Sequence, residues 1–160
     1  MAKGKRKAAP RDVASNRQAG YRYQFLERFE CGIVLTGTEV KSLREGKAQL
    51  KDSYAAIRDG EVWLIGTYIP PYGPASRENH EPERPRKLLL HRSEIERLTG
   101  KTRERGLTLV PTRIYFGPDS ARAKVEIALA RGKDVHDKRE TIRKREVARE
   151  VQRELRDARR

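Results

Sequence analysis

Four carboxylates fall near the ends of predicted strands, at Glu30, Glu39, Asp52 and Glu61. Grouped carboxylates can hold Mg²⁺ and support phosphodiester cleavage, so these residue types allow a nuclease site. Each also has an ordinary role: Asp52 as a turn acceptor, Glu39 in a first helical turn where the dipole favours negative charge, Glu61 as a solvated hairpin position. Ser53 adjoins Asp52 but lies far from any histidine in sequence, which is no triad signature. We therefore predict no catalytic residues.

The histidines and the single cysteine do not form a metal-binding pattern. His80, His91 and His136 lie far apart, without the HxH or HExxH spacing of zinc sites. Cys31 stands alone, which excludes an internal disulfide and a Cys-rich zinc site, and its place beside a strand favours burial. The sequence contains no glycine-rich phosphate loop. We expect no metal, no cofactor and no enzymatic activity.

The charge distribution indicates a polyanionic partner. The chain has 160 residues and a net charge of +14, of which +6 falls in residues 1–22, +3 in residues 23–130 and +5 in residues 131–160. Nucleic acid is the commonest partner of such a surface. A membrane surface fits less well, because neither end has a broad apolar face with Trp or Phe. No membrane-spanning run or signal-peptide core is present, so we expect a cytoplasmic protein.

Three residues are candidate RNA contacts, although each also has a structural interpretation. Glu30, at a strand end, can accept N–H groups from an exposed base edge, or it can be a surface charge. Lys124, on an alternating strand, can reach phosphate, but a solvated strand face explains it equally well. Leu89 lies in an apolar run and would ordinarily belong to the core.

Hydrophobic periodicity predicts short strands with two short helices. A strand with alternating aromatic residues begins at Tyr21, and Asp59-Gly60 between two apolar runs is a strong hairpin signal. A second apolar run, 33–35, precedes a helix over 39–45. A non-periodic loop over 70–85 and a short strand from 86 follow. A helix is predicted from the N-cap Ser93, with Glu96 as its capping-box partner, to about residue 105. The last two strands cover 107–116 and 122–130, and Pro111 marks an edge or a bulge in the first of them.

These elements predict a mainly β fold, an OB-fold-like, closed or partly open barrel of about six strands with two or three short helices. We divide the chain into a basic disordered arm (1–15), an RNA-binding barrel (16–131) and a basic tail (132–160). The tail has few large apolar residues and many i,i+3 and i,i+4 charge pairs. We expect it to be disordered when free and helical when docked.

Four stretches resemble the SmpB family, the small proteins that partner transfer-messenger RNA (tmRNA) in bacterial ribosome rescue. They are GIVLTGTEVKSLREGKAQLKDSYA, DGEVWLIGTYIPPY, RPRKLLLHRSEI and GKDVHDKRETIRKRE. The similarity runs in register from about Asn16 to Glu146. It implies an OB-fold barrel that binds the tRNA-like domain of tmRNA and carries the alanylated RNA, with elongation factor Tu, to stalled ribosomes.

The resemblance also assigns residues. RNA binding in this family depends on a carboxylate, a leucine and a lysine that correspond to Glu30, Leu89 and Lys124, which favours the RNA-contact interpretation of each. The candidate RNA-binding set is completed, at the start of the matched region, by Asn16, Arg17 and Tyr21.

The tail of such proteins enters the mRNA channel when it is empty, next to the decoding centre of the small ribosomal subunit. The residues implied at the decoding centre are Gly132, His136, Asp137, Lys138 and Arg139, and those along the channel are Arg143, Lys144 and Arg145. The stretch beyond Glu146 matches no pattern of the family. We expect a monomer; the alternatives are a generic OB-fold protein for structured or ribosomal RNA and a barrel nuclease that uses Glu39, Asp52 and Glu61.

Overall fold

The barrel is formed by one antiparallel sheet. The computed structural model describes residues 11–118, 121–133 and 135–159. Its strands are β1 (Arg11–Ser15), β2 (Tyr23–Ile33), β3 (Tyr54–Arg58), β4 (Glu61–Ile65), β5 (Arg86–Leu89), β6 (Leu107–Phe116) and β7 (Ala123–Gly132). Within the described ranges the seven strands pair in the order β1-β6-β3-β4-β5-β2-β7, and β7 also pairs with β6. Six strands therefore close a ring, which confirms the predicted OB-fold-like barrel.

The extent of strand pairing differs around the ring. β2 and β7 pair along nearly their whole length, from Tyr23 opposite Gly132 to Gly32 opposite Lys124. β3 and β6 share a single register pair, Ala55 opposite Leu109. The barrel is thus firmly joined on the β2–β7 side and partly open between β3 and β6. Its interior is filled by buried side chains, among them those of Val62, Leu64, Leu88, Ile114, Val125 and Ile127.

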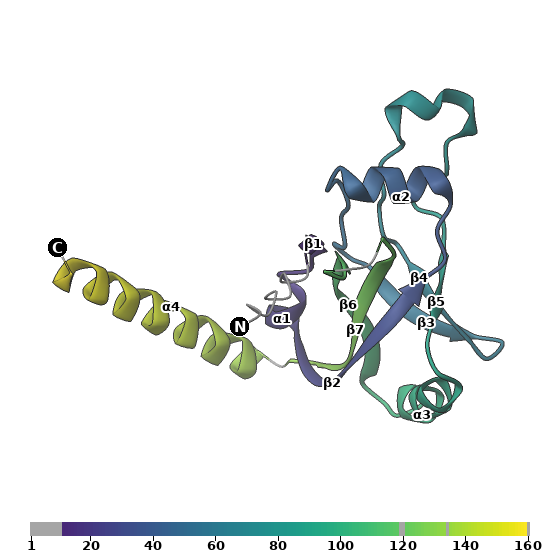
Figure 1. Cartoon of the computed structure of the whole chain (residues 1–160). Coiled ribbons are helices and arrows are strands. Elements are labelled where there is room, and N and C mark those ends of the chain that lie inside the picture. Colours follow the sequence, from purple (N-terminus) through teal and green to yellow (C-terminus); the bar gives the residue numbers. More distant parts are fainter. Residues whose placement is uncertain (1–10, 119–120, 134, 160) are drawn as a thin grey trace, which may run out of the picture.

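The helices lie outside the ring. They are α1 (Ala19–Arg22), α2 (Gly37–Arg44), α3 (Arg92–Thr102), α4 (Val135–Ala158) and a 3₁₀ helix, η1 (Gly73–Glu78). α2 and α3 lie at opposite ends of the barrel, η1 projects beyond α2, and α4 extends away from the barrel next to α1 (Figure 1). No helix in the described part of the chain is long and apolar enough to cross a bilayer.

Local sequence explains the first corner of the barrel. α2 begins with a capping box in which Thr36 and Glu39 each bond to the other's backbone N–H, and it is followed by Gly46 at φ +76°. Asp59 and Gly60 both have positive φ, as a two-residue type I′ hairpin requires, and they join β3 to β4 as predicted.

The N-terminal boundaries differ from the predicted ones. The disordered arm was predicted over 1–15, but residues 11–15 form β1 on β6, and residues 1–10 lie outside the described part. Tyr21 belongs to α1, so the strand begins at Tyr23. Asn16 explains the difference, because its backbone N–H bonds to the Thr112 carbonyl at 2.7 Å and its side-chain amide bonds to the Pro111 carbonyl at 3.1 Å. These bonds hold the chain against β6.

Three further predictions on local structure are corrected. The apolar run at 33–35 is not a separate strand, because β2 continues to Ile33 and ends there. α3 is preceded by His91 at the N-cap, not Ser93, and no side chain caps it. The predicted loop over 70–85 contains η1 and is tied down by His80, whose ring nitrogens bond to the Thr38 hydroxyl and the Ile69 carbonyl, both at 2.9 Å. Pro111 does mark a bulge, where the β6–β7 register shifts.

The tail is helical in the structure, and its predicted disorder in the free protein stays a prediction. Residues 135–158 form one continuous helix, although its large apolar side chains, Ile142, Val147, Val151 and Leu155, are 40–59% exposed. Little burial stabilises this helix, and its N-terminal part is anchored to the barrel. Lys133 provides the anchor: its ammonium bonds to the Gly20 carbonyl at 3.0 Å and to the Thr141 hydroxyl at 2.8 Å.

A buried ion pair fastens α2 to the barrel. Glu39 and Arg86 are both fully buried, and the Glu39 carboxylate accepts from Arg86 Nε and from Arg84 Nη2. Arg86 also donates to the Thr67 carbonyl at 2.8 Å. Burial by itself would raise the pKa of Glu39, but the Thr36 amide and the two guanidinium groups outweigh it and lower that pKa. Glu39 is therefore a charged structural residue that links α2 to β5.

We expect Arg86→Met to lower the free energy of unfolding by about 3–5 kcal/mol, because it leaves a buried carboxylate without its main partner. Urea denaturation at pH 7 measures the change. The control is the double variant Glu39→Met/Arg86→Met, which removes both charges and should lose less stability than Arg86→Met alone. A double variant as unstable as Arg86→Met would show that the loss does not come from an unpaired charge.

Candidate nucleic-acid interface

Strand register brings the three main RNA-binding candidates together. Gly32 of β2 pairs with Leu89 of β5 on one side and with Lys124 of β7 on the other. Glu30 lies two residues before Gly32, so its side chain lies on the same face of the sheet. All four residues line a groove of about 700 Å³. Its other lining residues are Ile33, Val34, Leu35, Val40, Leu90, His91, Ala121, Arg122 and Ala123.

The groove combines an exposed apolar wall with charged side chains. Leu89 and Val34 are 50% and 45% exposed, so the interpretation of Leu89 as a core residue is wrong. Glu30 is exposed, and Lys124 is half-buried. An apolar surface can stack against an unpaired base, a carboxylate can accept its N–H groups, and an ammonium can bind phosphate. The arrangement therefore has the chemistry needed to hold an unpaired nucleotide.

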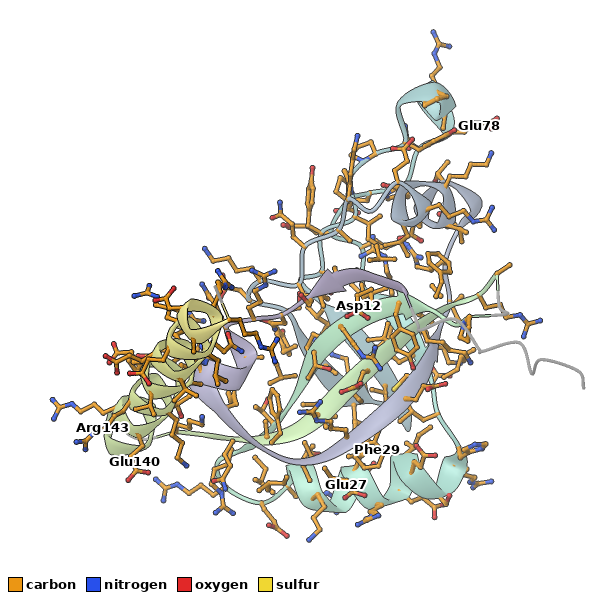
Figure 2. The ribbon with its side chains drawn as sticks, turned by 60° about the vertical axis from the view of Figure 1, so that its left-hand side comes forward. Asp12, Glu27, Phe29, Glu78, Glu140 and Arg143 are labelled. Carbon is orange, nitrogen blue, oxygen red and sulfur yellow. The ribbon has the colours of Figure 1, made fainter. Side chains whose placement is uncertain are left out.

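A charged strip continues from the groove across the outer face of β7 and β6. The Arg113 guanidinium bonds to Glu126 at 2.9 Å and to Asp12 at 3.0 Å, and Arg28 bonds to Glu126 at 3.1 Å. Figure 2 shows Asp12 on this outer face of the sheet. Partial burial opposes the charged form of Glu126, but its hydrogen bonds from Arg113 and Thr112 prevail and lower its pKa. Burial also opposes the charge on Arg113, whose pKa is nevertheless raised by its two carboxylate partners.

The predicted RNA-binding residues at the start of the barrel lie elsewhere. Asn16 lines a separate pocket of about 290 Å³ between α1, β3 and β6, together with Arg22 and Asp52. Its side-chain amide is engaged with the backbone of β6, so it has a structural role at this position. Arg17 is exposed and Tyr21 is half-buried. The structure therefore divides the predicted set between two places.

The predicted tail residues lie on or next to α4. Gly132 ends β7, opposite Tyr23, whereas the side chains of residues 136–138 (His136, Asp137 and Lys138) lie outside the described part. The remaining ones, Arg139, Arg143, Lys144 and Arg145, are exposed. Arg143 and Glu140 lie on the helix away from the barrel (Figure 2). Arg145 turns toward α1 instead, since a Cβ atom added to Gly20 would lie 3.8 Å from its Nη2 atom.

The four carboxylates considered for a nuclease site are dispersed, and three of them form separate ion pairs. Glu39 pairs with Arg84 and Arg86, Asp52 with Arg22 at 3.2 Å, and Glu61 with Lys87 at 2.7 Å. The fourth, Glu30, lies in the groove. Within the described ranges, no three His, Cys, Asp or Glu residues are grouped as metal ligands. Cys31 is buried, and burial raises the pKa of its thiol to about 12, so it is not a reactive nucleophile.

Comparison with known proteins identifies the family to which the barrel belongs. The family model described as "SmpB protein" matches residues 13–157, nearly the whole chain. The chain belongs to the SmpB family. Two similar proteins, both named SsrA-binding protein, come from Desulforudis audaxviator (58% identical over 144 residues, 90% of this chain and 93% of the relative) and Syntrophobacter fumaroxidans (60% over 141 residues, 88% and 86%).

A solved structure adds a structural match. It is described as "tmRNA-SmpB: a journey to the center of the bacterial ribosome", and one of its chains aligns with a TM-score of 0.65 and 49% identity. The alignment covers 81% of this chain and 93% of that chain. The resemblance of the sequence motifs to the SmpB family is therefore confirmed at the level of both family and fold.

Sequence reasoning missed four residues around the groove of this SmpB-family barrel: Gly32, His91, Tyr115 and Arg122. Gly32 had a usable signal, because a glycine inside a strand often marks a close approach of another chain segment. Here a Cβ atom at position 32 would lie 3.2 Å from the Leu89 Cβ atom. The other three carry no local signal, since only strand register and the return of distant loops bring them near Glu30.

We expect Gly32→Ala to displace Leu89 and to lower the free energy of unfolding by about 1–3 kcal/mol, the usual cost of overpacking. Urea denaturation and the NMR shifts of the Leu89 methyl groups measure the two effects. Gly73→Ala is the matched control, because an added Cβ there meets nothing within 4 Å. Equal stability of the two variants, with unchanged Leu89 shifts, would contradict a close contact between positions 32 and 89.

Proposed function

We propose that this protein is a non-enzymatic RNA-binding adaptor of trans-translation, acting in the bacterial cytoplasm as a monomer. It binds the tRNA-like domain of tmRNA, also called SsrA RNA, and delivers it to stalled ribosomes. The observation that carries the proposal is the single groove formed by Glu30, Leu89 and Lys124 on an SmpB-family barrel. Relatives named SsrA-binding protein, more than half identical over most of the chain, support it.

The groove binds RNA through three complementary contacts. Leu89 and Val34 provide the exposed apolar wall against which an unpaired base packs. Glu30 accepts N–H groups from the edge of that base, which favours bases that present donors. Lys124 neutralises a phosphate, and the excess positive charge of the chain attracts the RNA over longer distances. Arg17 and Tyr21, with Asn16 fixing the local backbone, extend the RNA-binding surface to α1.

The tail provides the ribosomal contact. Its first part, with Gly132, His136, Asp137, Lys138 and Arg139, reaches the decoding centre of the small subunit, and Arg143, Lys144 and Arg145 lie along the mRNA channel. A basic helix can occupy that channel only when no message fills it, so the tail distinguishes stalled from translating ribosomes. Elongation factor Tu takes part indirectly, through the alanylated tmRNA. The continuous, exposed helix α4 supports this role.

Competition binding tests the barrel site. Labelled tRNA-like domain is bound at about 0.15 M salt, where exposed charges are well screened, and is challenged with excess ordinary tRNA. We expect the label to remain bound and Glu30→Ala to weaken binding roughly tenfold, because a hydrogen bond to a charged group is lost. Lys124→Ala should also lower the dependence of log K on log salt by about one unit.

The matched control for Lys124→Ala is Lys101→Ala, which removes an exposed lysine of α3 outside the groove and should bind like the wild type. Displacement by ordinary tRNA, together with full binding by Glu30→Ala, would instead indicate a generic barrel protein for structured RNA. Cleavage of the RNA during incubation with protein and Mg²⁺ would favour the nuclease alternative.

A truncation tests the tail. The chain should be cut after Lys133 rather than at the predicted boundary between residues 131 and 132, because Gly132 still pairs with Tyr23 and the Lys133 N–H bonds to the Arg22 carbonyl. We expect unchanged RNA affinity and loss of rescue of ribosomes stalled on truncated messages. A cut after Glu146 keeps all the predicted contact residues and serves as the control. Rescue by the protein cut after Lys133 would rule out the tail as the sensor.

A further inference from the structure

We propose that Tyr115 is a positioning residue of the RNA site, whose hydroxyl holds the Glu30 carboxylate in the orientation that receives the base. The inference rests on the proposed function, since it concerns how the groove binds RNA. Tyr115 belongs to β6 and does not line the groove itself. It therefore acts on the RNA only through Glu30.

Register places Tyr115 beside the groove. Tyr115 pairs with Lys124 across β6 and β7, and Lys124 pairs with Gly32 across β7 and β2. Side chains of directly paired residues lie on the same face of the sheet, so Tyr115 shares the outer face with Lys124 and Glu30. Burial raises the pKa of Tyr115 and the Glu30 carboxylate raises it further, which supports a hydroxyl that reaches across β7 toward this carboxylate.

The Tyr115 ring is itself held in place. Only 4% of the residue is exposed, although it belongs to the outer face of the barrel. The Arg113 guanidinium covers the ring at 4.2 Å from its centroid, and two carboxylates, those of Asp12 and Glu126, fix that guanidinium from opposite strands. Strands β1, β6 and β7 thus determine the position of the phenol before any RNA arrives.

The phenol can act only as a donor to Glu30. Because burial and the nearby Glu30 carboxylate both raise the pKa of Tyr115, the hydroxyl keeps its proton at any pH at which the protein works. A hydrogen bond from this hydroxyl occupies one acceptor position of the carboxylate and leaves the others for the base. It also restricts the Glu30 rotamer, which reduces the conformational entropy lost on binding.

A double-mutant cycle on the full-length protein tests the inference, with the affinity for the tRNA-like domain as the readout. The variants are Tyr115→Phe, Glu30→Ala and the double variant. Tyr115→Phe keeps the ring under Arg113 and removes only the hydroxyl. We expect it to weaken binding roughly five- to tenfold in the wild-type background and not at all in the Glu30→Ala background, because its effect passes through the carboxylate.

Tyr68→Phe is the matched control, because Tyr68 is an exposed tyrosine that lines neither the groove nor the pocket beside α1, and it should bind like the wild type. Equal losses from Tyr115→Phe in both backgrounds, or no loss in either while Glu30→Ala still weakens binding, would overturn the positioning role and leave the proposed function standing. Full binding by Glu30→Ala would instead count against the proposed function.

A second measurement avoids any change at position 115. In the free wild-type protein we expect an NMR signal from a Tyr115 hydroxyl proton that exchanges slowly with water, and we expect Glu30→Ala to abolish it. A hydroxyl signal that persists in Glu30→Ala, or that is absent from the wild type, would overturn the inference even if Tyr115→Phe failed to fold.

Discussion

The candidate site depends on the register of β2 between β5 and β7. This register sets Gly32 between Leu89 and Lys124, and Glu30 opposite Glu126. Because side chains alternate along a strand, a slip of one residue would turn Glu30 into the core and bring Cys31 to the surface. The buried alternation of Phe29 and Cys31 against Val125 and Ile127 opposes such a slip, so the apolar interior determines where the charged residues of the groove lie.

Strong local signals made much of the fold predictable. The alternating strands and the Asp-Gly hairpin were predicted, because neighbouring residues determine them, and Glu39 was placed in the first turn of α2 without its capping box being predicted. The predicted element boundaries were wrong where contacts between residues far apart in the chain determine the local structure. Residues 11–15 follow a basic stretch typical of a disordered arm, yet they pair with the backbone of β6 as a strand. Ser93 is a good N-cap residue, but the chain leaving β5 enters α3 earlier, at His91.

The site was harder to predict from the sequence than the fold. Periodicity could place Glu30 at a strand end and Lys124 on an exposed face, but it treated Leu89 as a core residue. Whether Leu89 faces inward depends on its pairing with Gly32, which links residues far apart in the chain. Tyr115 illustrates the same limit, because in sequence it is an aromatic residue of a strand and only the folded sheet brings it to Glu30. Family resemblance supplied the roles, and register supplies the physical reason for them.

Strand β7 gives the molecule a fixed internal length. Lys124, the second residue of β7, lies at the groove. Gly132, its last residue, directly precedes Lys133, which anchors α4. Eight steps of an extended strand span roughly 26 Å. Because β7 is hydrogen-bonded to β2 and β6 on its two sides, this spacing cannot stretch as a flexible linker would. The strand therefore fixes the distance between the groove and the start of α4, so RNA bound in the groove also determines where the helix begins.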